Sequence, residues 1–76
     1  MTGQQIKHYF VRHLIELRQE RGMSQADLAK ALGISRSAVG MYEQGRREPD
    51  FETIGSISDY FGVSFDWLLG YEEEAF

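Results

Sequence analysis

The sequence predicts a compact all-α domain of five short helices, and three observations support this fold class. Apolar residues recur every three or four positions in successive segments, which is the spacing of one face of an α-helix. Serine or aspartate precedes several of these segments and glycine follows them, as expected of residues that cap and end helices. The chain has only 76 residues, which is enough for one domain with a modest core.

The first helix is expected from Ile6 to Arg21, after a polar and flexible N-terminus at residues 1–5. The residues that face the core at helical spacing are Phe10, Leu14 and Leu17. A second apolar stripe packs either on the C-terminal segment or on a partner, and it consists of Val11 and Ile15. His8 and His13 are five positions and about 140° apart on this helix, so they cannot share a metal and are expected at the surface.

Two further helices, residues 25–32 and 36–44, are predicted on either side of a tight turn. Ser24 caps the first of them, and Asp27 three residues later makes a near capping box. Gly33 ends that helix because glycine accepts the left-handed conformation that closes a helix. The corresponding cap and end residues of the second helix are Ser35 and Gly45.

The helix at residues 36–44 has one apolar and one polar face. Its inward side chains at about 100° per residue are Ala38, Val39 and Tyr42. Its opposite arc carries Arg36, Ser37, Gly40, Met41 and Gln44. Such a helix can present hydrogen-bonding groups to base edges, and a major groove about 12 Å wide admits it. The spacing is that of a helix-turn-helix, with residues 36–44 as the recognition helix.

The outward residues suggest specific base contacts. Arg36 can reach guanine O6 and N7 in a bidentate contact, and Ser37 can bond a base edge or a phosphate. Met41 is apolar and can touch the methyl group of thymine. Gly40 costs helix stability, and two interpretations stay open for it: close approach to the duplex, or simple tolerance.

A loop at residues 45–50 follows the recognition helix. Arg46 and Arg47 stand where the duplex backbone is expected to pass, so we expect them to bind phosphate, with solvated surface charge as the alternative. Pro49 disfavours helix at the residue before it, and Asp50 caps the next helix.

The fourth helix ends at Gly62, and its apolar residues at helical spacing are Phe51, Ile54, Ile57 and Phe61. Ser64 caps a short fifth helix that ends at Gly70. Trp67 belongs either to the core or to the shared core of a dimer, because aromatic residues concentrate at interfaces. The expected division of the chain is a flexible N-terminus (1–5), a helix-turn-helix domain (6–70) and an acidic C-terminal tail (71–76).

In order and spacing, the chain resembles the phage repressor and Cro type of helix-turn-helix domain, often called the Xre family. The matching positions are Arg18, Gln25, Leu28, Ala29, Leu32, Gly33, Ser35, Val39, Tyr42, Glu43, Gly45 and Pro49. The segment VSFDWLLG at residues 63–70 is also typical of this family. The resemblance implies a five-helix λ-repressor-like fold and a regulator of transcription, most often a repressor, that binds double-stranded DNA.

The resemblance also implies roles for individual residues. In this family, an arginine at the place of Arg18 forms a structural ion pair with a glutamate at the place of Glu43. Gln25, at the first position of its helix, matches the family's phosphate contact. Longer polar residues are frequent in the family at the place of Met41, so direct readout here rests on few side chains. The remaining phosphate contacts are Gln44, Arg46 and Arg47.

The charges are unevenly distributed, although the chain as a whole carries −4. Residues 1–47 contain all eight basic residues and four acidic ones, giving +4. Residues 48–76 contain eight acidic residues and no base, giving −8. Because binding to phosphate depends on the local patch, a basic half is compatible with DNA binding.

Composition excludes several classes of protein. The chain has no cysteine, so it can form no disulfide or thiolate metal site. No apolar run approaches the roughly 20 residues of a membrane span, and the N-terminus does not resemble a signal peptide. These observations fit a cytoplasmic protein, and the resemblance to phage repressors implies a bacterial or phage origin. No catalytic constellation or metal-ligand cluster is evident, so we expect no enzyme, no cofactor and no metal.

Few base contacts per domain favour a homodimer on a palindromic operator. The expected dimer surface lies on the fifth helix and involves Phe65, Trp67 and Leu68. The alternative function is a protein-interaction module on the same fold, such as an antitoxin. The acidic half and the apolar stripe of the first helix motivate that alternative, in which a protein partner occupies the exposed faces.

Overall fold

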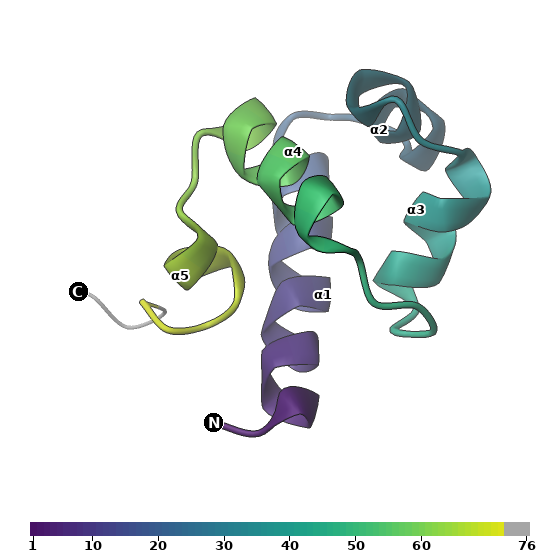
Figure 1. The fold of residues 1–76 in the computed structure, drawn as a ribbon. Helices are drawn as coiled ribbons and strands as arrows, with labels where there is room; N and C mark the ends of the chain where they lie inside the picture. The colour runs from purple at the N-terminus through teal and green to yellow at the C-terminus, as the bar shows by residue number, and fades with distance from the viewer. Residues whose placement is uncertain (73–76) are drawn as a thin grey trace.

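The computed structural model describes residues 1–72. Within this range the chain forms five α-helices and no strand, which confirms the predicted fold class (Figure 1). The helices are α1 (Gly3–Glu20), α2 (Gln25–Leu32), α3 (Arg36–Glu43), α4 (Phe51–Phe61) and α5 (Phe65–Leu68). No helix in the described part of the chain is long and apolar enough to cross a membrane.

Helix α1 runs through the middle of the domain and the other helices are arranged around it (Figure 1). Helices α2 and α3 pack on each other on one side, and α3 also contacts α1. Helix α5 packs on α1 from the opposite side, and α4 contacts both α2 and α5. The helix-turn-helix is therefore held between α1 and α4, with its outer side left open.

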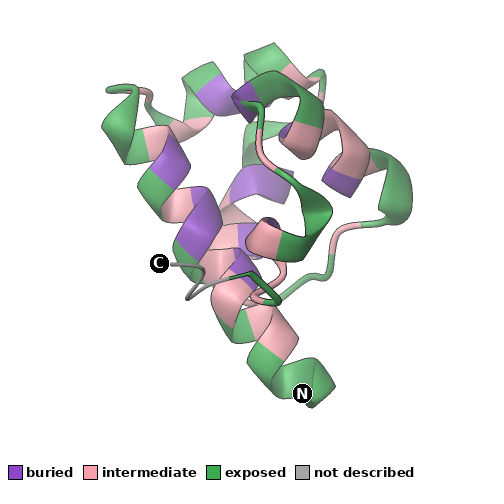
Figure 2. Ribbon diagram, turned by 90° about the vertical axis from the view of Figure 1, so that its left-hand side faces the viewer, coloured by how far each residue is buried: buried purple, intermediate pink, exposed green. Residues whose placement is uncertain are grey.

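The core lies where the inner faces of all five helices meet, while the outer faces are exposed (Figure 2). Each helix contributes at least one buried apolar side chain to this single cluster. Its members are Phe10, Leu14, Leu17, Leu28, Ala29, Ala38, Val39, Tyr42, Ile54, Ile57, Phe61 and Leu68. The periodicity of the sequence predicted the inward face of α1 and of α3.

Helix α1 begins at Gly3, so the predicted start at Ile6 is wrong by three residues. Thr2 is the N-cap: its hydroxyl accepts from the backbone N–H of Gln5 at 3.2 Å, and Gln5 Oε1 accepts from the Thr2 N–H at 2.7 Å. This capping box satisfies two backbone donors at once. The helix therefore begins at positions that have no apolar side chains, so their spacing could not have predicted it.

Two predictions about the contact between α1 and α5 are wrong. His13 was expected at the surface, but it is 1% exposed and its Nδ1–H donates to the carbonyl oxygen of Leu68 at 3.2 Å. Its ring also stacks on Trp67, with the ring centroids 3.8 Å apart. Leu68 was expected on a dimer surface, but it is fully buried. Trp67 is partly buried and packs against the core, which agrees with its interpretation as a core residue.

Candidate nucleic-acid interface

The turn between α2 and α3 has the geometry that its residues predict. Ser24 forms a full capping box with Asp27, whose backbone N–H donates to the serine hydroxyl at 3.0 Å. Gly33 closes α2 in the left-handed conformation, with φ at 70°. Ile34 packs against the core, and Ser35 caps α3 by accepting from the N–H of Ala38 at 3.0 Å.

Helix α3 has one buried and one open side. Val39 is fully buried, and the ring of Tyr42 meets the edge of Phe10 with centroids 6.3 Å apart. On the other side Arg36 and Ser37 are exposed. The side chains that can reach a ligand are therefore concentrated on the face that points away from the domain.

The predicted DNA contacts are brought together on this face. An open depression of about 390 Å³ is lined by Gln25, Arg36, Ser37, Gly40, Met41 and Gln44. All six residues were predicted to contact either bases or phosphate. Because α2 supplies Gln25 and α3 supplies or adjoins the others, the depression exists only when the two helices are held at a fixed angle.

An ion pair joins α3 to α1. Arg18 Nε donates to Glu43 Oε2 at 2.7 Å and Arg18 Nη2 donates to Glu43 Oε1 at 2.9 Å, which is a bidentate contact. Arg18 Nη1 also donates to the carbonyl oxygen of Met23 at 2.9 Å. The two charged side chains are only 14% and 5% exposed. Arg18 and Glu43 thus lie together as the resemblance implied, and hydrogen bonding to Glu43 raises the pKa of Arg18 above its ordinary value.

Gln25 joins this network, which the sequence did not predict. Its Nε2 donates to Glu43 Oε1 at 3.0 Å, so the amide group is oriented before any ligand arrives. Its Oε1 lies near Gly40, 3.8 Å from the place where a Cβ would stand. The contact joins the start of α2 to the last turn of α3. No sequence spacing signals it, because the two residues are 18 positions apart.

The two loop arginines differ in their surroundings. Both are exposed, but the Arg47 guanidinium lies over the ring of Tyr42, 5.7 Å from its centroid. The backbone N–H of Arg46 donates to the carbonyl oxygen of Met41 at 2.9 Å, which ties the loop to the end of α3. Arg46 therefore starts from the last turn of the recognition helix, and Arg47 is directed toward the aromatic ring behind it.

Two residues whose surroundings differ from their predictions lie outside the predicted sites. Phe51, the first residue of α4, is 87% exposed although its spacing placed it on the core face. His13 is buried between α1 and α5. A signal for His13 was available, because it lies three residues after Phe10 and four before Leu17, on the same face of the helix.

Comparisons with known proteins agree with this geometry. Residues 14–68 match the HTH_3 family, described as helix-turn-helix. The chain is 42% identical over 60 residues to the uncharacterised HTH-type transcriptional regulator YqaE of Bacillus subtilis, in a match covering 79% of this chain and 52% of YqaE. It is 37% identical over 62 residues to the HTH-type transcriptional regulator ImmR of the same organism, covering 82% and 49%.

A solved structure has the same arrangement of helices. The crystal structure of a transcriptional regulator from Listeria innocua superposes with a TM-score of 0.76 at 32% identity, covering 82% of this chain and 58% of that one. The chain spans about half the length of the curated relatives named above. Each of these relatives is named as a regulator of transcription and none as an enzyme.

Proposed function

Because the chain belongs to the HTH_3 family of Xre/Cro/C1-type helix-turn-helix DNA-binding domains, we propose that it recognises a specific sequence in double-stranded DNA and regulates transcription. The observation that carries this proposal is the depression on α2 and α3, where four polar residues, one glycine and one methionine converge on an open face. The buried Arg18–Glu43 pair supports it, since it holds the recognition helix without using the side chains that face outward.

In the proposed complex, α3 lies in the major groove and reads base edges. Arg36 binds guanine O6 and N7, the commonest specific contact, and Ser37 bonds a neighbouring base edge. Met41 touches thymine methyl groups, and Gly40 lets the duplex come close to the helix backbone. Arg36 is the principal determinant, because the other three residues offer one hydroxyl and two apolar surfaces.

The phosphate backbone is held on both sides of the groove. Gln25 binds a phosphate from the start of α2, where backbone N–H groups and the helix dipole favour an anion. Gln44 and Arg46 bind the backbone beyond the other end of α3, and Arg47 contributes charge when it leaves the Tyr42 ring. These contacts position the domain and add affinity without reading sequence.

We further propose that the protein acts as a repressor and binds as a two-fold dimer. Repression is favoured by the resemblance to phage repressors. A dimer is favoured because one domain reads few bases, and two half-sites with centres about 34 Å apart give useful specificity. The operator is then a palindrome whose symmetry matches that of the protein.

Selection of random duplex DNA against the purified protein tests the proposal. We expect enrichment of a palindrome with a guanine in each half-site and half-site centres separated by one helical turn. An enriched single half-site would contradict the dimeric mode but leave DNA recognition intact. Recovery of random sequence, with no enrichment over protein-free selection, would contradict sequence-specific recognition itself. A reporter gene placed behind the selected site then distinguishes repression from activation.

A further inference from the structure

No local feature of α4 requires an exposed phenylalanine at position 51. It is the first residue of α4, where the helix is already capped by the side chain of Asp50, which accepts from the N–H of Thr53 at 2.8 Å. The ring is 87% exposed, more than any other large apolar side chain that the structure describes. An aromatic ring in water gives up the free energy that burial would provide. The helix start would be equally well capped with a polar residue at this position.

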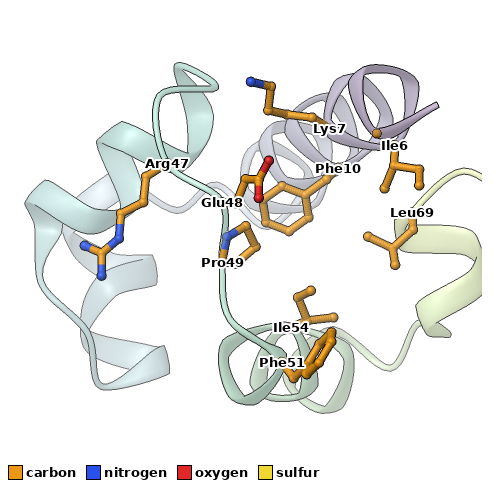
Figure 3. A pocket seen from close by; sticks show the side chains of 10 residues that line it. Ile6, Lys7, Phe10, Arg47, Glu48, Pro49, Phe51, Ile54 and Leu69 are labelled. Atoms are coloured by element: carbon orange, nitrogen blue, oxygen red, sulfur yellow. The ribbon is translucent and has the colours of Figure 1, made fainter.

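Phe51 is itself one of the residues that line an apolar groove (Figure 3). The groove has a volume of about 260 Å³ and is formed where the start of α1, the loop before α4 and the residue after α5 meet. The apolar side chains along it come from Ile6, Phe10, Ile54 and Leu69, with Pro49 on the loop side. A ring and a groove of this kind on one face form a self-complementary pair, which is the requirement of a two-fold interface.

Opposite charges border the groove. Lys7 on α1 and both Arg47 and Glu48 in the loop line it, and the Arg47 guanidinium lies over the ring of Tyr42. Within residues 1–72, Lys7 and Glu48 form no ion pair with each other. Where a two-fold axis brings Lys7 of one copy to Glu48 of the other, the same contact occurs a second time. The rim therefore offers a pair of opposite charges to a second copy of itself.

We propose that the Phe51 ring of one copy occupies the groove of a second copy of this chain, and the reverse. This inference rests on the proposed function, because it names the surface through which the dimer on DNA is formed. It replaces the surface expected on α5, where Leu68 is buried. The loop that carries Arg46 and Arg47 also borders the groove, so a contact here places both loops beside each other and both α3 helices toward one duplex.

The size of the domain fits a small interface of this kind. Its principal extents are 30 × 24 × 20 Å, while adjacent half-sites lie about 34 Å apart. Two copies on one operator therefore touch along an edge rather than across a broad face. Such an edge has room for two symmetric contacts, each formed by one ring in one groove. An interface of this size gives a dimer that forms mainly on DNA.

Binding to a palindrome and to a single half-site separates the interface from DNA recognition. Phe51→Ala is expected to lose cooperativity on the palindrome by about tenfold or more, because two rings leave the interface. Its affinity for the single half-site stays that of the wild type. Phe65→Ala tests the surface expected on α5 instead, since that ring is 48% exposed and does not line the groove. Unchanged cooperativity in Phe51→Ala, or an equal loss in Phe65→Ala, would overturn the proposal.

A second measurement needs no DNA, so it stands even if the proposed function fails. The chain has no cysteine, so one introduced cysteine reports on one contact. We expect Lys7→Cys and Glu48→Cys proteins, mixed and mildly oxidised at high concentration, to form a disulfide-linked heterodimer. Mixing Lys7→Cys with Lys30→Cys, an exposed position on α2, provides the control. Equal linkage in both mixtures would count against the interface.

Discussion

The α2–α3 half and the α4–α5 half of this domain are held in place by different kinds of contact. On α3, a buried ion pair and an amide bridge orient the helix through atoms with fixed directions. On α5, orientation depends on the stacked rings of His13 and Trp67, on one buried leucine and on one hydrogen bond, from His13 Nδ1–H to the carbonyl oxygen of Leu68. Ionic hydrogen bonds specify an angle, whereas apolar packing mainly specifies a distance.

This difference follows the use that each half makes of its outer surface. The α2–α3 half presents polar side chains around an open depression, whereas the α4–α5 half has acidic residues and no basic ones and presents aromatic rings. A helix that reads bases must be placed within a fraction of an ångström, because hydrogen bonds lose strength quickly with misalignment. A helix that serves as an apolar surface tolerates small shifts.

The largest expected effect comes from breaking the ion pair. Arg18→Ala and Glu43→Ala should each destabilise the fold by about 3–5 kcal/mol, because each leaves one largely buried charge without its partner. The double variant should cost much less than the sum of the two. Denaturant unfolding of the three proteins measures the coupling between the residues.

The same variants test whether the pair sets the angle of α3. DNA binding should fall in both single variants although neither side chain needs to read a base. Gln25→Ala keeps the pair and removes only the amide bridge, so it should lose less stability than either single variant. Additive losses in the double variant would mean that the two residues do not interact, and the contrast between the halves would then have no energetic basis.

The second prediction separates contacts with bases from contacts with phosphate. Arg36→Ala should lose about 1–3 kcal/mol of operator binding and relax the preference at one base position. Arg46→Ala should weaken all sequences about equally and reduce the salt dependence by roughly one ion. Titration of the selected operator and of a scrambled duplex at several salt concentrations measures both. Wild-type specificity in Arg36→Ala would show that another residue reads the site.

The third prediction compares the helical glycines of the two halves. A Cβ added at Gly40 would meet only Gln25 Oε1 at 3.8 Å, and one added at Gly55 in α4 only Phe65 Cζ at 4.0 Å. Both are ordinary contacts, so Gly40→Ala and Gly55→Ala should each stabilise the helix by about 0.5–1 kcal/mol. Only Gly40→Ala should weaken DNA binding. Equal operator affinity in both variants would mean that Gly40 is merely tolerated.

The smallest expected effect concerns the cap of α2 and its dependence on pH. The Ser24 backbone N–H donates to Asp27 Oδ2 at 2.9 Å, and this bond, with that to the serine hydroxyl, lowers the pKa of Asp27. A lowered pKa in the folded state stabilises the fold above the unfolded value of about 3.9 and loses that effect as the pH falls through the folded value. Asp27→Asn should therefore be less stable than the wild type at neutral pH.

Unfolding at pH about 7 and at pH about 3 checks this difference. The gap between Asp27→Asn and the wild type should narrow as Asp27 is protonated in acid. Glu16→Gln, at an exposed position on α1 outside any cap, serves as the control for general charge effects. A gap that stays constant across this range would exclude a contribution from the carboxylate charge.

Local signals predicted most of the helix-turn-helix. Ser24, Gly33 and Ser35 act within three or four residues of their own positions, so their effects on α2 and α3 follow directly from the sequence. The same holds for the outward arc of α3, because a single helix fixes which residues share a face. Five of the six residues lining the depression were named in advance for this reason, and Gln25 was named from the family resemblance.

Contacts between distant residues could not be predicted in the same way. The bridge from Gln25 to Glu43 and the bond from His13 to Leu68 depend on the final packing of helices. The amide of Gln25 resembles a surface group in sequence, and the helical spacing of His13 places it on the buried face without identifying its partner. Phe51 illustrates the opposite error, since a periodic apolar residue was assigned to the core and is exposed.

The three donations of Arg18 have a consequence for how this domain can change its target. One guanidinium group joins α1, the segment before α2, and α3, and none of these bonds uses a residue that faces the groove. Arg36, Ser37 and Met41 can therefore be exchanged as a set without repacking the fold. Under the proposed function, substitution at these few positions gives a new operator preference, while the contacts that hold α3 in place stay unchanged.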